Sequence, residues 1–394
     1  MDFTCTGRHC YRPERALFQY FVRFVTYYTS CLLFDIKVVT IYNVFFYNKQ
    51  KTPKRKGVPG LQQVFVINPV AGKKDAGEWL VPAIRRAAAD IGTDPEIYCT
   101  VCAGHARSLT ERLAADGRDV AVYACGGDGT LNEVLQAAAG HDNVAVGCVP
   151  CGSGNDFVRN FGRVEDFLDM EGQLRAVPVR ADALQTSMGV GVDICAAGLD
   201  AQVAYGIPKF RRLPGCGGTM AYSLSILQAL CSPFGHKLRI CIDGEEHTGT
   251  YMLTAVCNGQ LYGGGYRAAP QARMDDGLLD IVLVKPLSRL RIASLLSLYR
   301  QGKHIGPDGQ VIPSLARWMW SGRARSITMD VLDTRPIIAT LDGECLPVRH
   351  LEIQNDPGRL RLLLPPAVLQ SQTVLAGASP CTAGDTVPGR ENNV

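Results

Sequence analysis

The chain has 394 residues, which is enough for two or three domains of ordinary size. Hydrophobic residues make up 46% and charged residues 20%, as in a globular protein with a sizeable core. The net charge of +4 is uneven, because ten Lys or Arg and three Asp or Glu fall within residues 1–60. The remaining chain is therefore mildly acidic and lacks a basic patch interleaved with aromatic residues, which argues against a nucleic-acid partner.

The chain contains 15 cysteines, scattered along its length. The first residues lack the apolar core and cleavage site of a signal peptide, so we expect reduced thiols in a cytoplasmic protein. Two CxxC pairs, Cys99/Cys102 and Cys148/Cys151, are compatible with a zinc or redox site. Both pairs fall at the ends of predicted strands, where cysteine commonly serves as a small hydrophobic residue.

Residues 1–60 form an aromatic and basic extension that we expect to be poorly ordered. Its longest uncharged run, 24–34, has 11 residues, fewer than the ~20 that a membrane-spanning helix needs. A basic linker at 49–56 follows. Three interpretations remain open: an interfacial membrane anchor, an extra structural element, or an upstream extension foreign to the natural protein, which we favour.

Strand and helix patterns alternate through the next part of the chain. Unbroken apolar runs and helical periodicities that alternate in this way indicate βαβ units and a parallel sheet. Ligands of such sheets gather at the carboxyl ends of the strands, where four loops of this chain converge. Residues 61–72, with the apolar run 64–67, are predicted as a strand that runs into a turn. The other predicted strands are 96–101, 120–124 and 144–149, and the predicted helices are 79–89, 108–115 and 131–139.

The run Gly126–Glu133, GGDGTLNE, is the most informative of these loops. Glycines let a ligand approach the backbone, and the following helix start is suited to a phosphate chain. We expect Thr130 to cap that helix, with Glu133 completing a capping box. Asp128 implies either Mg²⁺ held between carboxylate and phosphates or a base for a hydroxyl nucleophile. An ordinary strand-to-helix turn is the alternative.

The loop 150–157, PCGSGNDF, repeats this chemistry after the next strand. Ser153 can donate to a phosphate oxygen, and Asp156 can join Asp128 around a metal ion. Taken alone, an Asn-Asp pair after glycine is more often a helix cap. The presence of two such loops favours phosphate binding.

Beyond residue 180 the pattern changes to short alternating strands, which indicates an antiparallel β domain. Asp275, the carbonyl of Leu278 and Asp280 are spaced to bind one hard cation, although an acidic turn is the alternative. Asp342 lies on a tight turn that either joins two strands or faces the cleft. The predicted strands are 189–196, 236–242, 248–257, 278–284, 326–331 and 337–341, and the predicted helical segments are 217–231 and 288–300.

Four stretches in the same order resemble the catalytic domain family of diacylglycerol kinases, in particular the soluble bacterial lipid kinases. They are NPVAG at 68–72, GGDGTLNEV, PCGSGNDF, and NGQLYGGGYRAAPQARMDDGLLD at 258–280. The resemblance covers residues 61–364. It implies a Rossmann-like N-terminal α/β domain, of the NAD kinase and diacylglycerol kinase type, and a C-terminal antiparallel β-sandwich. The implied division is extension 1–60, kinase domain 61–182, sandwich 183–345, returning strands 346–364 and disordered tail 365–394.

The resemblance also implies roles for individual residues. Asp128, Asp156 and Asp182 resemble a carboxylate network that positions catalytic Mg²⁺ through water, and Asp342 the proposed general base. Asp275, Leu278 and Asp280 resemble a structural metal loop. Ala71 stands where the family usually has Ser, and Leu199 where it usually has Phe. Neither replacement removes a carboxylate. The implied nucleotide-binding residues are Asn68, Pro69, Val70, Ala71, Gly72, Thr100, Gly126, Gly127, Asp128, Gly129, Thr130, Leu131, Asn132 and Ser153.

The expected reaction is ATP- and Mg²⁺-dependent phosphorylation of a hydroxyl on a diacylglycerol-like lipid. The alternatives are a nucleotide kinase of the NAD kinase type and a non-catalytic nucleotide or lipid sensor. The expected partners are ATP and a lipid at the membrane surface, met peripherally, with a homodimer possible. The segment 209–215 is a candidate interfacial loop, with a solvated charged loop as the alternative. The sequence does not name the lipid.

Overall fold

The structure, a computed structural model, describes residues 61–72, 74–213, 218–232 and 235–369. All of these residues belong to one compact unit. The predictions for residues 1–60 lie outside the described residues, as does 370–394 of the predicted tail.

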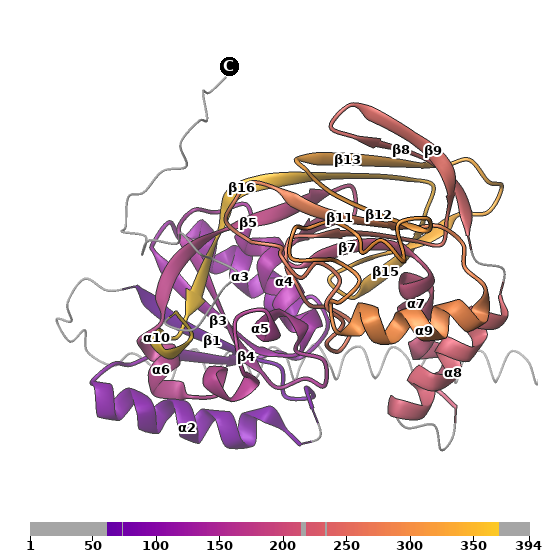
Figure 1. Cartoon of the computed structure of the whole chain (residues 1–394). Coiled ribbons are helices and arrows are strands. Elements are labelled where there is room, and N and C mark those ends of the chain that lie inside the picture. Colours follow the sequence, from indigo (N-terminus) through magenta and orange to yellow (C-terminus); the bar gives the residue numbers. More distant parts are fainter. Residues whose placement is uncertain (1–60, 73, 214–217, 233–234, 370–394) are drawn as a thin grey trace, which may run out of the picture. The chain divides into compact units, whose positions relative to one another are not determined.

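Parallel strands with helices on both faces form the N-terminal part of this unit (Figure 1). Their spatial order is β2 (Glu96–Cys99), β1 (Gln62–Ile67), β3 (Val120–Gly126) and β4 (Val144–Pro150), and the helices are α2 (Ala76–Ile91), α3 (His105–Ala115) and α4 (Asp128–Ala138). Helix α2 packs on one face through Leu80 and Ile84, whereas α3 and α4 pack on the other through Leu109 and Leu135. Strands β3 and β4 are buried throughout, as parallel strands covered on both faces should be.

The same sheet continues into antiparallel strands, so that the described residues form ten strands in one sheet. Strand β16 makes the junction, because it pairs in parallel with β4 at Leu362 and antiparallel with β5 and β13. Short helices α5 (Asp156–Arg159), η1 (Val164–Phe167) and α6 (Met170–Leu174) connect β4 to β5. The added strands are β5 (Val177–Thr186), β6 (Gly189–Gly191), β8 (His236–Ile242), β9 (Glu245–Tyr251), β13 (Ser326–Val331) and β16 (His350–Leu364).

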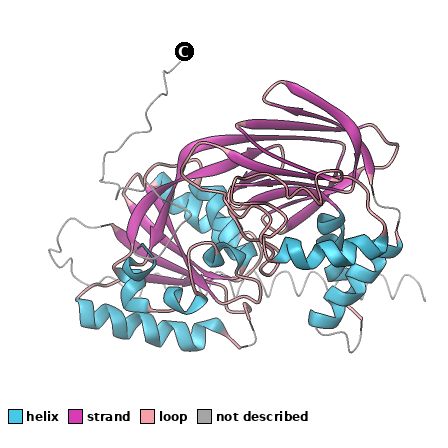
Figure 2. Cartoon of the chain, in the orientation of Figure 1, coloured by secondary structure: helices cyan, strands magenta, loops and turns pink. Residues whose placement is uncertain are grey.

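A second sheet of six described strands is antiparallel throughout (Figure 2). In spatial order it comprises β12 (Met319–Ala324), β11 (Leu279–Val284), β10 (Leu253–Cys257), β7 (Ile194–Gly198), β14 (Ile337–Leu341) and β15 (Glu344–Val348). Ile240 and Met329 of the first sheet pack against Val256 and Ile281 of the second, which makes a sandwich. The helices α7 (Leu199–Arg211), α8 (Gly218–Cys231) and α9 (Arg289–Arg300) lie together beside the second sheet (Figure 1).

The predicted fold class, an α/β domain followed by an antiparallel β domain, is confirmed. The main departure is α7, because its Gly206 and Pro208 resemble loop residues in the sequence. Lys209 and Arg211 accordingly lie in the last helical turn rather than in the predicted loop. The chain is also helical at α10 (Pro366–Leu369), inside the segment predicted as a tail.

Candidate active site

The loops that follow β1, β2, β3 and β4 meet at one edge of the parallel sheet, as predicted from their positions. Asn68, after β1, donates from Nδ2 to Oγ1 of Thr130 over 3.0 Å. The backbone amide of Asn155, after β4, donates to Oδ2 of Asp128 over 3.0 Å. Thr100, after β2, lies beside the end of β1, because its amide donates to the carbonyl of Ile67.

These loops touch backbone to backbone, which explains their glycines. A Cβ added to Gly152 would lie 2.6 Å from the Cα of Gly127, and one added to Gly72 would lie 2.5 Å from the carbonyl oxygen of Cys151. Helix α4 begins at this junction, directly after Gly127, and the start of a helix carries amides without intrahelical acceptors. Such an edge is suited to a chain of phosphates.

The predicted capping box at the start of α4 is wrong. The helix begins at Asp128, two residues before Thr130, with Gly127 as its N-cap and no side-chain cap. Thr130 is instead buried and accepts the hydrogen bond from Asn68. Glu133 caps the neighbouring helix α3, since its carboxylate accepts from the amides of Gly104 at 2.8 Å and Ala106 at 3.1 Å.

Asp128 and Asp156 link the phosphate loops to the second half of the fold. Oδ1 of Asp128 accepts from the amide of Asp156 over 3.0 Å. Oδ1 of Asp156 accepts from the amide of Gly264 over 2.8 Å, across 108 residues of sequence. Burial raises the pKa of both carboxyl groups, and the Asp128 charge further raises the pKa of Asp156.

The third member of the predicted network, Asp182, contacts a different region. Its Oδ1 accepts from the amide of Gly358 over 2.8 Å, and its Oδ2 accepts from that of Gly277 over 2.7 Å. It is absent from the residues that line the cavity described below. Asp182 therefore ties the loop before β11 to β16, and its role in a magnesium network stays a prediction.

Asp193, which the sequence analysis did not single out, lies beside the other carboxylates. Its Oδ1 accepts from Nδ2 of Asn160 over 3.0 Å. Burial raises its pKa well above the usual range, and the charges of Asp342, Asp156 and Asp128 raise the pKa further. The available signal was an acidic residue inside the otherwise apolar segment predicted as strand 189–196.

Asp342 is held by the chain segment that enters β7. Its carboxylate accepts from the amides of Val192 at 2.7 Å, Asp193 at 3.1 Å and Ile194 at 2.8 Å. Burial raises the pKa of Asp342 to about 6, against the opposing effect of these three amides. A carboxyl group with this pKa is ionised at neutral pH yet basic enough to take a proton.

The predicted metal loop before β11 is neutralised by arginine. Nε of Arg273 lies 3.2 Å from Oδ1 of Asp275, and Nε of Arg323 lies 3.4 Å from Oδ2 of Asp280. Arg323 also pairs with Asp276. Among the described residues, no cluster of three or more His, Cys, Asp or Glu side chains is arranged to hold a metal ion. These residues do not fit a metal unless Arg323 moves, and the predicted site stays a prediction.

A cavity of about 400 Å³ extends from the carboxylates toward the helices α7, α8 and α9. Its acidic end contains Asp128, Asp156, Asp193 and Asp342. Its other walls are largely apolar. We call it the amphipathic cavity, because it is acidic at one end and apolar toward the other. The apolar lining includes Leu199, Val203, Ala204, Ile207, Ile226, Leu230, Leu253 and Leu296.

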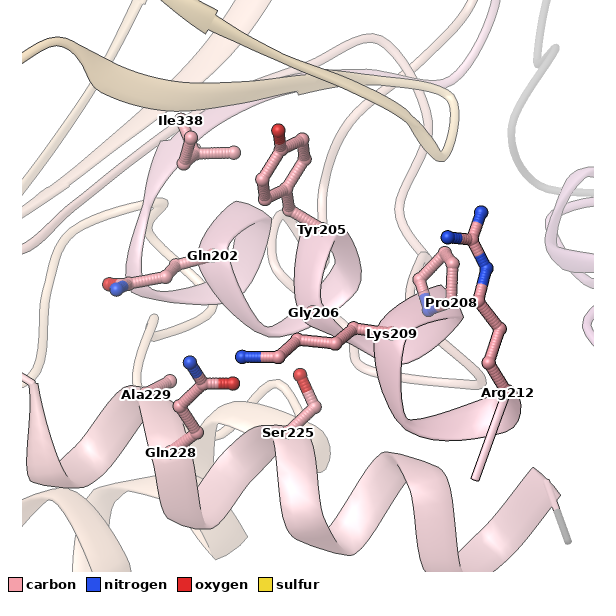
Figure 3. Close-up of a pocket in the computed structure, with 10 residues that line it drawn as sticks. All are labelled: Gln202, Tyr205, Gly206, Pro208, Lys209, Arg212, Ser225, Gln228, Ala229 and Ile338. Atoms are coloured by element: carbon pink, nitrogen blue, oxygen red, sulfur yellow. The ribbon is translucent and has the colours of Figure 1, made fainter. Parts of the chain in front are cut away.

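A second cavity, of about 570 Å³, lies on the opposite face of α7. Figure 3 shows Lys209 extending between α7 and α8 toward Gln228 and Ser225, whereas Arg212 points away from them. Ile338 of β14 lines this second cavity. Helix α7 therefore separates an amphipathic cavity from a basic one.

No helix in the described part of the chain is long and apolar enough to cross a membrane. The CxxC pairs are free thiols. Cys148 and Cys151 pack within or against the sheet's apolar clusters, consistent with a structural role.

Comparison with known proteins gives matches over almost the whole described chain. Residues 62–187 match the diacylglycerol kinase catalytic domain, and residues 193–364 match the YegS C-terminal NAD kinase beta sandwich-like domain. A crystal structure of a diacylglycerol kinase from Bacillus anthracis superposes with a TM-score of 0.56 at 20% identity, covering 78% of this chain and 98% of that one. This likeness concerns the fold alone.

Curated relatives agree with the domain matches. The diacylglycerol kinase of Bacillus subtilis is 26% identical over 248 residues, which are 61% of this chain and 79% of that protein. A Xanthomonas oryzae protein named "Probable lipid kinase YegS-like" is 31% identical over 278 residues, which are 66% of this chain and 84% of that protein. The chain thus belongs to the diacylglycerol kinase and YegS-like family of lipid kinases.

Proposed function

We propose that the protein transfers the γ-phosphoryl group of ATP to a hydroxyl of a diacylglycerol-like lipid in the presence of Mg²⁺. The observation that carries this proposal is the amphipathic cavity, whose acidic end adjoins the phosphate loops and whose apolar walls suit a lipid chain. A nucleotide acceptor would leave those apolar walls without a partner. The family membership and the cavity therefore favour a lipid acceptor over a nucleotide acceptor.

The nucleotide belongs, in this proposal, at the edge formed by the loops after β1 to β4. Segments 68–72 and 126–132, with Thr100 and Ser153, would surround its phosphates. Ser153 also lines the amphipathic cavity, as does Asp128. This position would place the γ-phosphoryl group at the acidic end of the cavity, where the acceptor hydroxyl must arrive.

Asp342 would act as the general base. When the acceptor oxygen forms its bond to the γ-phosphorus, its proton passes to the Asp342 carboxylate and ADP departs with the electrons of the broken P–O bond. The amides of Val192, Asp193 and Ile194 hold this carboxylate in place, and Asp342 lines the cavity. Most of the rate then derives from positioning and electrostatics, as in phosphoryl transfer generally.

At the acidic end, Asp128 and Asp156 together with the phosphates of ATP would supply oxygen ligands for a magnesium ion. Asp128 and Asp156 are half-buried carboxylates whose pKa values are raised by burial, and a nearby positive charge would stabilise their ionised forms. They would hold Mg²⁺, which when bound neutralises charge on the transferring phosphoryl group. The lipid would reach this site from a membrane surface that the protein meets peripherally.

The proposal is tested by incubating the full chain with γ-labelled ATP, Mg²⁺ and diacylglycerol in mixed micelles, followed by separation of lipid and aqueous phases. We expect label in one phosphorylated lipid, with a loss of at least about 100-fold in the folded Asp128→Asn variant. Label on NAD or another nucleotide would instead identify a nucleotide kinase. Bound ATP without transfer to any acceptor would identify a sensor.

A further inference from the structure

Helix α8 carries no charged side chain along its 14 residues. A helix at the surface of a water-soluble protein normally presents charged and polar side chains to the solvent. The main packing partner of α8 is α7, and the two helices lie side by side in Figure 1. With a length of about 21 Å, α8 is too short to cross a bilayer.

The side of α8 that packs on α7 consists of small residues. Ala221, Ser225 and Ala229, spaced four residues apart, are buried. The hydroxyl of Ser225 donates to the carbonyl of Val203 over 2.5 Å. A Cβ added to Gly206 of α7 would lie 2.3 Å from Oγ of Ser225, so the two helices are in close contact. This packing fixes which side of α8 faces outward.

The opposite side of α8 carries larger apolar residues, and they are exposed. Met220 and Leu227, about two turns apart, are 53% and 58% exposed. Ser223 and Cys231 lie on the same side of the helix and are also exposed. We call these four residues the outer face of α8. An exposed apolar surface without charged residues is typical of an interaction site.

The same helix also borders the amphipathic cavity, which Ile226 and Leu230 line. Nε of Arg289, at the start of α9, donates to the carbonyl of Leu230 over 2.7 Å and so joins α9 to α8. Leu296 of α9 lines the cavity and is 41% exposed, and Leu290 is 87% exposed. Apolar side chains therefore extend from the cavity wall to the outside of the molecule on α9.

The segments that carry these three helices are cationic. The chain after residue 60 is mildly acidic as a whole, so positive charge is concentrated here. A symmetric contact between two copies through this surface would bring like charges together, whereas an anionic membrane attracts them. Residues 201–213, 218–232 and 285–303 contain no Asp or Glu, and their Lys and Arg residues are Lys209, Arg211, Arg212, Lys285, Arg289, Arg291, Arg300 and Lys303.

We propose that the outer face of α8 inserts into the headgroup layer of a bilayer that contains anionic phospholipids, while Arg211 and Arg212 at the end of α7 contact acidic headgroups. The proposal rests on the proposed function, because it names the surface through which the lipid acceptor enters the amphipathic cavity. Helix α8 lies in the plane of the membrane, as interfacial helices do. Its residues Ile226 and Leu230 then border the path from the bilayer to the cavity.

Co-sedimentation of the full chain with vesicles of phosphatidylcholine and phosphatidylglycerol tests this surface, with phosphatidylcholine vesicles for comparison. Leu227→Glu removes an apolar side chain and adds a negative charge, so we expect binding to the mixed vesicles to fall at least about tenfold. The double variant Arg211→Gln/Arg212→Gln should lose about fivefold for each charge on the mixed vesicles, and less than about twofold on the neutral ones.

The matched control is Leu168→Glu, the same change at an exposed leucine in the N-terminal half, directly after η1. It alters the net charge equally, so any attraction by the basic residues 1–60 is the same in both variants. We expect this control to bind the mixed vesicles within about twofold of the natural chain.

Activity assays separate membrane contact from catalysis. On diacylglycerol embedded in the mixed vesicles, Leu227→Glu should lower kcat/KM at least about tenfold. On a short-chain diacylglycerol dissolved as monomers, kcat/KM should change less than about twofold, because Leu227 lines neither cavity.

Equal binding of Leu227→Glu and the natural chain to the mixed vesicles would overturn the inference, as would failure of the natural chain to bind them. A dimer in light scattering that Leu227→Glu dissociates, with vesicle binding unchanged, would also overturn it, because a second copy would then cover the outer face. A natural chain that binds the vesicles through α8 but phosphorylates no lipid would instead refute the proposed function and support the membrane surface.

Discussion

Replacing Gly152 by alanine tests whether the contact between the loops after β3 and β4 forms the phosphate site. The added Cβ would lie 2.6 Å from the Cα of Gly127, whereas ordinary contacts begin at 3.4 Å. The loops must therefore separate by about 1 Å, and misplacement of this size can cost on the order of 100-fold in rate. The loop after β4 resists this shift, because two hydrogen bonds fix it. Nδ2 of Asn155 donates to the carbonyl of Gly152 over 2.9 Å, and Oδ1 of Asn155 accepts from the amide of Gly152 over 3.0 Å.

We expect Gly152→Ala to lower kcat/KM for ATP by about 10- to 100-fold, while the KM for the lipid changes little. The crowding should also cost about 1–3 kcal/mol of unfolding free energy, visible as a Tm lowered by a few degrees. ATP titrations in an assay of ADP release, together with calorimetry, measure both effects.

The control is Gly140→Ala, because a Cβ at Gly140, just beyond the end of α4, meets nothing within 4 Å. This variant should keep the ATP kinetics of the natural chain. The reasoning fails if Gly152→Ala also keeps them, since the loops would then tolerate a separation that the proposed site forbids.

Two further predictions concern the acidic end of the cavity. Because burial raises the pKa of Asp342 to about 6, kcat/KM should rise about tenfold per pH unit below pH 6 and level off above it; a profile flat from pH 4.5 to 7 would exclude Asp342 as the base. Asn160→Ala should lower the free energy of unfolding by about 2–5 kcal/mol, because the amides of Gln260 and Leu261 lose their acceptor and Asp193 loses its donor. Chemical denaturation measures this loss, and a change below about 0.5 kcal/mol would show that water replaces Asn160.

Much of the N-terminal half follows from local patterns. Unbroken apolar runs predicted β1, β3 and β4 because a strand covered on both faces has no polar face to preserve. The convergence of the loops then follows from parallel strand direction alone. Helix boundaries were less predictable, because α4 begins at Asp128 without a side-chain cap.

The sequence by itself determined the fold class, the family and the predicted loops around Asp128, Asp156 and Asp342, because strand, turn and helix signals act over a few residues. Tertiary structure decided which carboxylates line the cavity. Asp193 lines it, whereas Asp182 accepts a hydrogen bond from the amide of Gly358 and does not line it. The hydrogen bonds that do this join residues far apart in sequence, such as Val192 and Asp342, 150 positions apart. Local periodicity carries no information about such pairs, so the cavity follows from the folded arrangement alone.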